Sequence, residues 1–167
     1  QIPASFQHNF VVCDDYVDTA NDDTDGIATF NFSSVTADIQ LLLPSPSTAY
    51  TIKYFPTQAD ALAETNEITN TTSYRNTIAN QHPIYVRVDS NLDNACFGLG
   101  NYVTLTVEKL PVANPITDYK ECDEISNDGI FTFNTATLQT DLLKGQTNVA
   151  VTYFDENNNP LPSPFPS

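Results

Sequence analysis

The sequence predicts an all-β protein made of tandem immunoglobulin-like β-sandwich repeats with short helical turns, the second repeat being truncated. Three observations predict this class. One set of motifs occurs twice, about a hundred residues apart. Short runs of alternating apolar and polar residues, rich in Val, Thr, Tyr and Phe, follow one another closely. Asn, Asp, Gly and Pro separate these runs, as turns require.

The repeated motif begins at Cys13 and again at Cys122. In each copy two acidic residues follow the cysteine, and then an Asn/Asp-rich stretch leads to Gly26 or Gly129 and the pattern Gly-Ile-x-Thr-Phe-Asn. The cysteines are 109 positions apart and the glycines 103, so the framework is kept while a connection shortens. This period is too long for a solenoid repeat and fits a whole domain. We expect residues 1–111 to form one β-sandwich and residues 112–167 the first half of a second.

The expected elements of the first repeat are mostly strands. We place them at residues 10–12, 28–32, 50–55, 73–75, 84–88 and 102–107. Val35, Ile39 and Leu42 have helical spacing, as have the corresponding residues 138–143, so each repeat is expected to carry a short helix. Thr57 is the expected N-cap of a helical turn over residues 57–64.

Prolines mark the expected connections and the end of the chain. Residues 110–115 contain two prolines and form a semi-rigid linker, and residues 159–166 are a polyproline-type edge segment. The antibody-type signature is absent, because the sequence has no Trp.

Charge and motifs exclude several classes of function. The net charge is −15 with six basic residues, which disfavours nucleic acids and anionic membrane surfaces as partners. No apolar run approaches the roughly 20 residues of a membrane span. Neither an initiator Met nor a leader is present, so we expect a mature chain or an excerpt. His8 and His82 lack ligand spacing and are interpreted as solvated loop residues, and no catalytic motif appears, so we do not expect an enzyme.

Cys13 and Cys96 are the two cysteines of the first repeat, and Cys122 is the counterpart of Cys13. The simplest interpretation is one disulfide per repeat, Cys13 to Cys96, with the partner of Cys122 expected beyond Ser167. The bridge would close a loop of 83 residues (96 minus 13), worth about 4.5 kcal/mol in the chain-entropy model. It also implies an oxidising compartment. The alternative is three buried thiols.

The acidic stretch before the first motif glycine suggests calcium. Three residues alternate like the first ligands of a calcium loop: Asn21, Asp23 and Asp25. Gly26 stands at the position of the tight turn, but the position of the bidentate Glu is Phe32. Asp14, Asp15 or Asp18 is then the candidate for the missing carboxylate. The alternative is an Asp/Asn/Gly turn without an ion.

Tyrosines recur along the expected strands and allow two interpretations. These residues are Tyr50, Tyr54, Tyr74, Tyr85 and Tyr102. As an exposed row they would indicate a carbohydrate-binding module of a secreted polysaccharide-degrading protein, and as buried residues they would fill the core.

Taken in order, these motifs resemble one family of repeats. The similarity rests on the two cysteine motifs, on residues 52–61, 74–77, 84–88, 96–97 and 105–107, and on residues 151–157 and 159–164 of the second copy. The chain resembles the repeats of very large gliding-motility adhesins that the type IX secretion system exports. The resemblance implies an extracellular, cell-surface filament that uses its repeats as spacers in attachment and gliding.

The resemblance also implies the partners. They are neighbouring repeats of the same chain, the substratum or surface glycans, and the outer-membrane secretion and motility machinery. Residues 18–20, Asp-Thr-Ala, resemble the O-glycan attachment sites of such bacteria, which makes Thr19 a candidate glycosylation site.

Overall fold

Two units make up the chain, Gln1–Leu110 and Pro111–Ser167. The division lies one residue from the boundary expected at residue 111. The computed structural model describes residues 2–17, 23–117, 120, 122, 128–163 and 165–166, without the side chains of residues 93–95, 133 and 165–166. Among the described residues, no helix combines the length and the apolar character that a membrane crossing requires.

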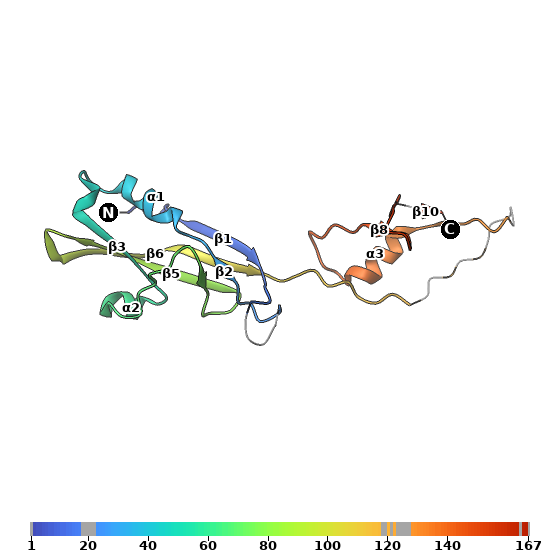
Figure 1. Cartoon of the computed structure of the whole chain (residues 1–167), viewed down its shortest axis with the longest axis horizontal. Helices are drawn as coiled ribbons and strands as arrows, with labels where there is room; N and C mark the ends of the chain where they lie inside the picture. The colour runs from blue at the N-terminus through green and yellow to red at the C-terminus, as the bar shows by residue number, and fades with distance from the viewer. Residues whose placement is uncertain are drawn as a thin grey trace. The chain divides into compact units, whose positions relative to one another are not determined.

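A four-stranded sheet forms most of the first unit (Figure 1). Its strands, in spatial order, are β1 (His8–Cys13), β6 (Asp93–Glu108), β5 (Gln81–Ser90) and β3 (Tyr50–Phe55). β1 and β6 are parallel, and the other neighbours are antiparallel. The first and last strands of the unit are therefore adjacent and run in the same direction.

Shorter elements cover this sheet. β2 (Thr29–Phe30) pairs with β4 (Tyr74–Arg75) in a separate antiparallel ribbon. The helix α1 (Ser34–Leu42) follows β2 and buries Val35 and Ile39, as their spacing predicts, whereas Leu42, the third residue of the expected apolar face, is exposed. The 3-10 turn η1 (Ser47–Ala49) leads into β3. The helix α2 (Gln58–Ala63) has the expected N-cap, since the side chain of Thr57 accepts a hydrogen bond from the N–H of Asp60.

The core lies between the sheet and these covering elements. Phe32 is fully buried, and its ring meets those of Phe10, Tyr54 and Tyr74 at centroid distances of 5.4–6.4 Å. The alternating side chains of β5 and β6 supply six more core residues: Ile84, Val86, Val88, Val103, Leu105 and Val107. The first unit is thus mostly β, with a layered core consistent with a β-sandwich.

The second unit contains shorter elements. They are β7 (Thr132–Phe133), α3 (Thr135–Leu143), β8 (Tyr153–Phe154), β9 (Pro160–Leu161) and β10 (Phe165–Pro166). β7 pairs with β10, and β8 pairs with β9, both antiparallel. The order β7, α3, β8 corresponds to the order β2, α1, β3 of the first unit.

The repeated motif residues have the same local structure in both units. Gly26 and Gly129 have φ angles of +76° and +79°. The side chains of Asp25 and Asp128 accept hydrogen bonds from the N–H two residues on, at 2.7 and 2.9 Å. Positive φ is unfavourable for most side chains, so glycine is the residue that suits this point of the motif best.

Candidate disulfide sites

Cys13 is the last residue of β1 and is exposed. It lies opposite Glu108, the last residue of β6. The N–H of Asp14 donates to the carbonyl of Glu108 at 2.9 Å, so the pairing continues one residue beyond the strand. Cys13 therefore lies at the end of the sheet where the chain leaves the first unit.

Asp14 holds the loop that follows Cys13. Its carboxylate is 5 % exposed and accepts two backbone hydrogen bonds, from Asp15 at 3.0 Å and from Gly26 at 2.8 Å. A Cβ on Gly26 would lie 2.7 Å from the backbone nitrogen of Asn80, which donates to the carbonyl of Gly26 at 2.9 Å. Asp14 and Gly26 of the repeated motif thus form one hydrogen-bonded corner. A larger residue at position 26 would collide with the backbone of Asn80 and disrupt this corner.

Asp15 and Arg75 form the second part of this corner. The guanidinium of Arg75 lies 2.7 Å from the carboxylate of Asp15, which also accepts the N–H groups of Val17 and Thr29. Burial pushes the pKa of Asp15 upward, but the hydrogen bond from Arg75, the two backbone donors and the charge of Arg75 outweigh it and lower the pKa. Asp15 therefore stays ionised and fixes the loop to β2 and β4.

Asn76 completes the corner, and sequence reasoning missed it. It is buried, accepts the N–H of Ala28 at 2.7 Å, and donates to the carbonyls of Gly26 and Ile78 at 2.9 and 2.8 Å. Its partner Ala28 is 48 residues away in sequence, so no local pattern signals the contact. We call Asp14, Asp15, Arg75 and Asn76 the polar frame; it holds the backbone on both sides of the loop next to the Cys13 thiol.

Asp14 and Asp25, two of the calcium candidates, accept backbone hydrogen bonds in this structure. Both carboxylate oxygens of Asp14 bind backbone N–H groups, and Asp25 accepts the N–H of Ile27. The part of the chain described here contains no group of three His, Cys, Asp or Glu side chains arranged to hold a metal ion. Asn21 and Thr19 lie outside the described residues, so calcium binding and glycosylation at these positions stay predictions.

Cys96 is exposed and lies in β6, next to the hairpin that joins β5 to β6. The guanidinium of Arg87 lies 4.1 Å from the ring centre of Phe97, the residue after Cys96. Arg87 also pairs with Asp89 at 2.7 Å and Glu64 at 2.9 Å, and donates to a carbonyl of α2. These contacts fix the strand on which Cys96 stands.

The two cysteines of the first unit lie at opposite ends of the sheet. Cys13 is opposite Glu108, and Cys96 precedes Glu108 by twelve residues on the same strand. At about 3.3 Å per strand residue this separates them by roughly 35–40 Å. A disulfide requires the two Cα atoms within about 7 Å. The bridge expected between Cys13 and Cys96 of one repeat is therefore incompatible with this fold, and all three cysteines are exposed, in contrast to the alternative of buried thiols.

His82 is not the solvated loop residue that the sequence suggested. It belongs to β5, is fully buried, and contacts the carbonyl of Pro56 at 3.1 Å through Nε2. Its Nδ1 accepts the N–H of Thr77 at 3.3 Å, and burial lowers its pKa. His8 lies in β1, 3.7 Å from Asp38. Neither histidine lies beside a cysteine.

The strand tyrosines do not form an exposed row. Tyr54 is buried, and Tyr50, Tyr74 and Tyr102 pack against the core while partly buried. Tyr85 lies opposite Asn101. The tyrosines therefore give no support to a carbohydrate-binding face.

Comparison with protein-family models matches residues 9–111 to the Flavobacterium inter-domain disulphide bond domain. Neither curated proteins nor solved structures gave a match. The matched residues include Cys13, Cys96 and the polar frame, and they extend over more than half of the chain. The chain thus belongs to the family of the Flavobacterium inter-domain disulphide bond domain.

Proposed function

We propose that this chain is an extracellular spacer segment whose consecutive domains are joined by disulfides, and that the spacer belongs to a cell-surface adhesin. The observation that carries the spacer role is the position of Cys13 and Cys96 at opposite ends of one sheet. The family description, an inter-domain disulphide bond domain, agrees with this position. We assign the chain a structural role rather than a catalytic one.

The course of the chain indicates which cysteines would pair. Ile2 lines the same groove as Cys96, so the described chain begins near the Cys96 end of the unit, which Figure 1 shows as the end with the N-terminus. The chain leaves after Glu108, next to Cys13. In a head-to-tail array, Cys13 of one domain therefore approaches the cysteine that corresponds to Cys96 in the following domain.

The bonds require oxidation. When two such thiols join, they lose two protons and two electrons, and a dithiol–disulfide oxidoreductase of the oxidising compartment would accept the electrons. Each bond then adds a second covalent connection between neighbouring domains, in parallel with the linker. Because β1 and β6 are parallel neighbours, tension on the ends of a domain would load their shared hydrogen bonds together along the strands.

Disulfide mapping tests the spacer role. The parent protein is isolated under thiol-blocking conditions, digested without reduction, and analysed by mass spectrometry. We expect a peptide containing Cys13 to be bonded to a peptide with the Cys96 counterpart of the next domain. Alkylated Cys13 and Cys96 throughout, or a bond between the two within one domain, would refute the inter-domain role.

The adhesin part of the proposal has separate support and a separate test. It is supported by the resemblance of the cysteine motifs to repeats of gliding adhesins exported by the type IX system. Antibodies raised against residues 1–110 should label intact cells that make the parent protein and should reduce their attachment to a surface. Labelling only after cell lysis would contradict the surface location.

A further inference from the structure

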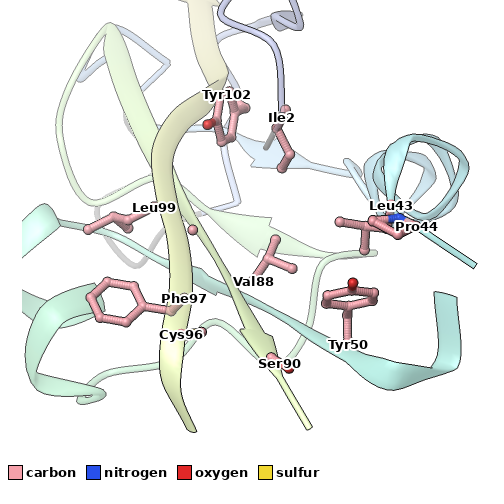
Figure 2. Close-up of a pocket in the computed structure, with 11 residues that line it drawn as sticks. Ile2, Leu43, Pro44, Tyr50, Val88, Ser90, Cys96, Phe97, Leu99 and Tyr102 are labelled. Carbon is pink, nitrogen blue, oxygen red and sulfur yellow. The ribbon is translucent and has the colours of Figure 1, made fainter. Parts of the chain in front are cut away.

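A groove opens beside Cys96 at the hairpin end of the first unit. Its volume is about 710 Å³, comparable with the sites that take up whole ligands. None of the residues that line it carries a charge. Figure 2 shows β6 along its edge, with Phe97 and Leu99 on one side of the strand and Val88, Leu43 and Pro44 on the other.

Glycines in β6 explain why the groove is open. Gly100 is covered by the ring of Tyr102, because a Cβ there would lie 2.4 Å from that ring. Gly98 lies two residues nearer the hairpin than Gly100 and is not covered in this way, since a Cβ on Gly98 would meet no atom within 4 Å. Gly98 pairs with Val88, which belongs to the buried core. The groove is thus a continuation of the core face that no side chain of the described residues covers.

We propose that this groove is the docking site for the Cys13-bearing end of another domain of the same kind. The occupant is the segment that follows Cys13 and contains Tyr16 and Val17, whose side chains are 59 % and 69 % exposed. The inference rests on the proposed inter-domain disulfide and adds a non-covalent contact to it. The groove would select the correct cysteine before the bond forms.

The reach of the chain supports this occupant. A disulfide brings the Cα atoms of its cysteines to within about 7 Å. Val17 lies four residues beyond Cys13, so it stays within roughly 14 Å of Cys13 along the chain. The groove begins at Cys96 itself and continues over Gly98. A bond between Cys13 and Cys96 therefore brings two exposed, uncharged side chains to the opening of an uncharged groove.

The charge distribution points to the same segment. The chain has 21 acidic residues and a net charge of −15. Because burying a charge in an apolar groove is unfavourable, much of the surface of a second domain is a poor occupant. The two acids directly after Cys13 are held inward by the polar frame, through Gly26 and Arg75. Tyr16 and Val17 come next in sequence, and Val17 is fixed by its N–H bond to Asp15.

The test measures the rate of pairing between two single-cysteine forms of the whole chain. One form keeps Cys13 (Cys96→Ser, Cys122→Ser), and the other keeps Cys96 (Cys13→Ser, Cys122→Ser). The Cys96 form is first converted to its mixed disulfide with thionitrobenzoate. The thiolate of Cys13 attacks the Cys96 sulfur, the new S–S bond forms, thionitrobenzoate leaves as an anion whose absorbance is recorded, and the proton of Cys13 passes to the buffer.

We expect the Cys13 form to react with the activated Cys96 form at least about tenfold faster than either form reacts with its own activated copy. Rates with a small thiol correct for the reactivity of each activated cysteine. Gly98→Leu places a side chain in the groove, starting from a Cβ that meets no atom within 4 Å, and should abolish the preference. Asn101→Leu, on the same strand outside the groove, should not. On the partner, Val17→Asp should abolish it, whereas Val112→Asp, at another exposed valine, should not.

The outcomes separate the docking from the disulfide. Retention of the preference in both Gly98→Leu and Val17→Asp would overturn the groove as a docking site and leave the Cys13–Cys96 pairing intact. A second outcome concerns the single-cysteine forms without further substitutions. If the Cys13 form reacts with the activated Cys96 form no faster than each form reacts with its own activated copy, the docking is overturned, and the result also counts against the pairing in the proposed function. Because Val17 is already exposed, its variant is informative even if Gly98→Leu fails to fold.

Discussion

When tension unfolds the domains of a head-to-tail array, the increase in its length should depend on whether disulfides are absent, join neighbouring domains or lie within each domain. Without any disulfide, an unfolded domain releases residues 2–108, about 360 Å of extended chain at roughly 3.4 Å per residue. About 40 Å of this is the length of the folded sheet, estimated from the strand rise. Reduced arrays should therefore lengthen in steps of about 320 Å per domain.

Disulfides between domains would remove these steps. The force would be carried by the shortest path of covalent bonds through the array, which we call the covalent route. This route would enter a domain at residue 2, leave it at Cys13, pass through the disulfide to Cys96 of the next domain and leave that domain after Glu108. Each domain on this route contributes either residues 2–13 or residues 96–108, and nearly all of these already lie in β1 or β6. Residues 14–95 carry no tension, so unfolding them adds almost no length.

Single-molecule force spectroscopy on a tandem array of residues 1–115 distinguishes the arrangements. We expect steps of about 320 Å in reductant and none of that length after oxidation, with Cys96→Ser arrays behaving as reduced arrays in both conditions. A Cys13–Cys96 bridge within each domain would instead leave about 25 residues, 2–13 and 96–108, on the covalent route. Each unfolding domain of the oxidised array would then lengthen it by roughly 45 Å. Full-length steps from an array shown to lack thiols would refute the inter-domain route.

Three changes test the fold around the cysteines, and one tests the ion. Asp14→Asn removes one charged acceptor from the polar frame and should cost about 1.5–3 kcal/mol in urea unfolding, whereas Glu67→Gln, the same charge change at an exposed site, should cost little. Phe32→Ala should cost about 3–5 kcal/mol and the exposed Phe154→Ala under about 1 kcal/mol, measured in the same way; equal costs would contradict the assigned core. Burial lowers the pKa of His82 below the ordinary histidine value of 6.5, so the unfolded chain takes up a proton at a higher pH than the folded chain does. The melting temperature should therefore fall as the pH drops through 6.5, and the same fall in His82→Gln would exclude His82 as the cause. Calcium binding at the acidic stretch predicts that calcium added to the chelator-treated chain raises the melting temperature, and an unchanged melting temperature would remove the ion from the account.

Local patterns predicted the local elements well. The spacing of Val35 and Ile39 predicted α1, and Thr57 was recognised as the N-cap of α2 because both signals lie within one or two helical turns. β6 was underestimated. It begins at Asp93 rather than near residue 102, because Gly98 and Gly100 weaken the strand signal and pairing with β5 supplies what propensity does not.

Contacts between distant residues could not be predicted. The partners Asp15 and Arg75 are 60 residues apart, and nothing in the sequence around either one indicates the other. The same limit explains the error about Cys13 and Cys96. The sequence showed that the first domain carries two cysteines, but only the parallel pairing of β1 with β6 shows that they lie at opposite ends.

The polar contacts near the two cysteines would help so acidic a chain to be joined end to end by the proposed disulfides. Two like-charged domains repel, and a bond between them is easiest where the charge at the joint is smallest. At one end, the carboxylates of Asp14 and Asp15 are held by backbone donors and by Arg75. At the other end, Arg87 is neutralised by Asp89 and covered by Phe97, so the strand that carries Cys96 borders an uncharged groove. In the proposed joint, the acidic pair of the repeated motif, which first suggested an ion, would contribute by engaging its charge in hydrogen bonds and an ion pair within its own domain.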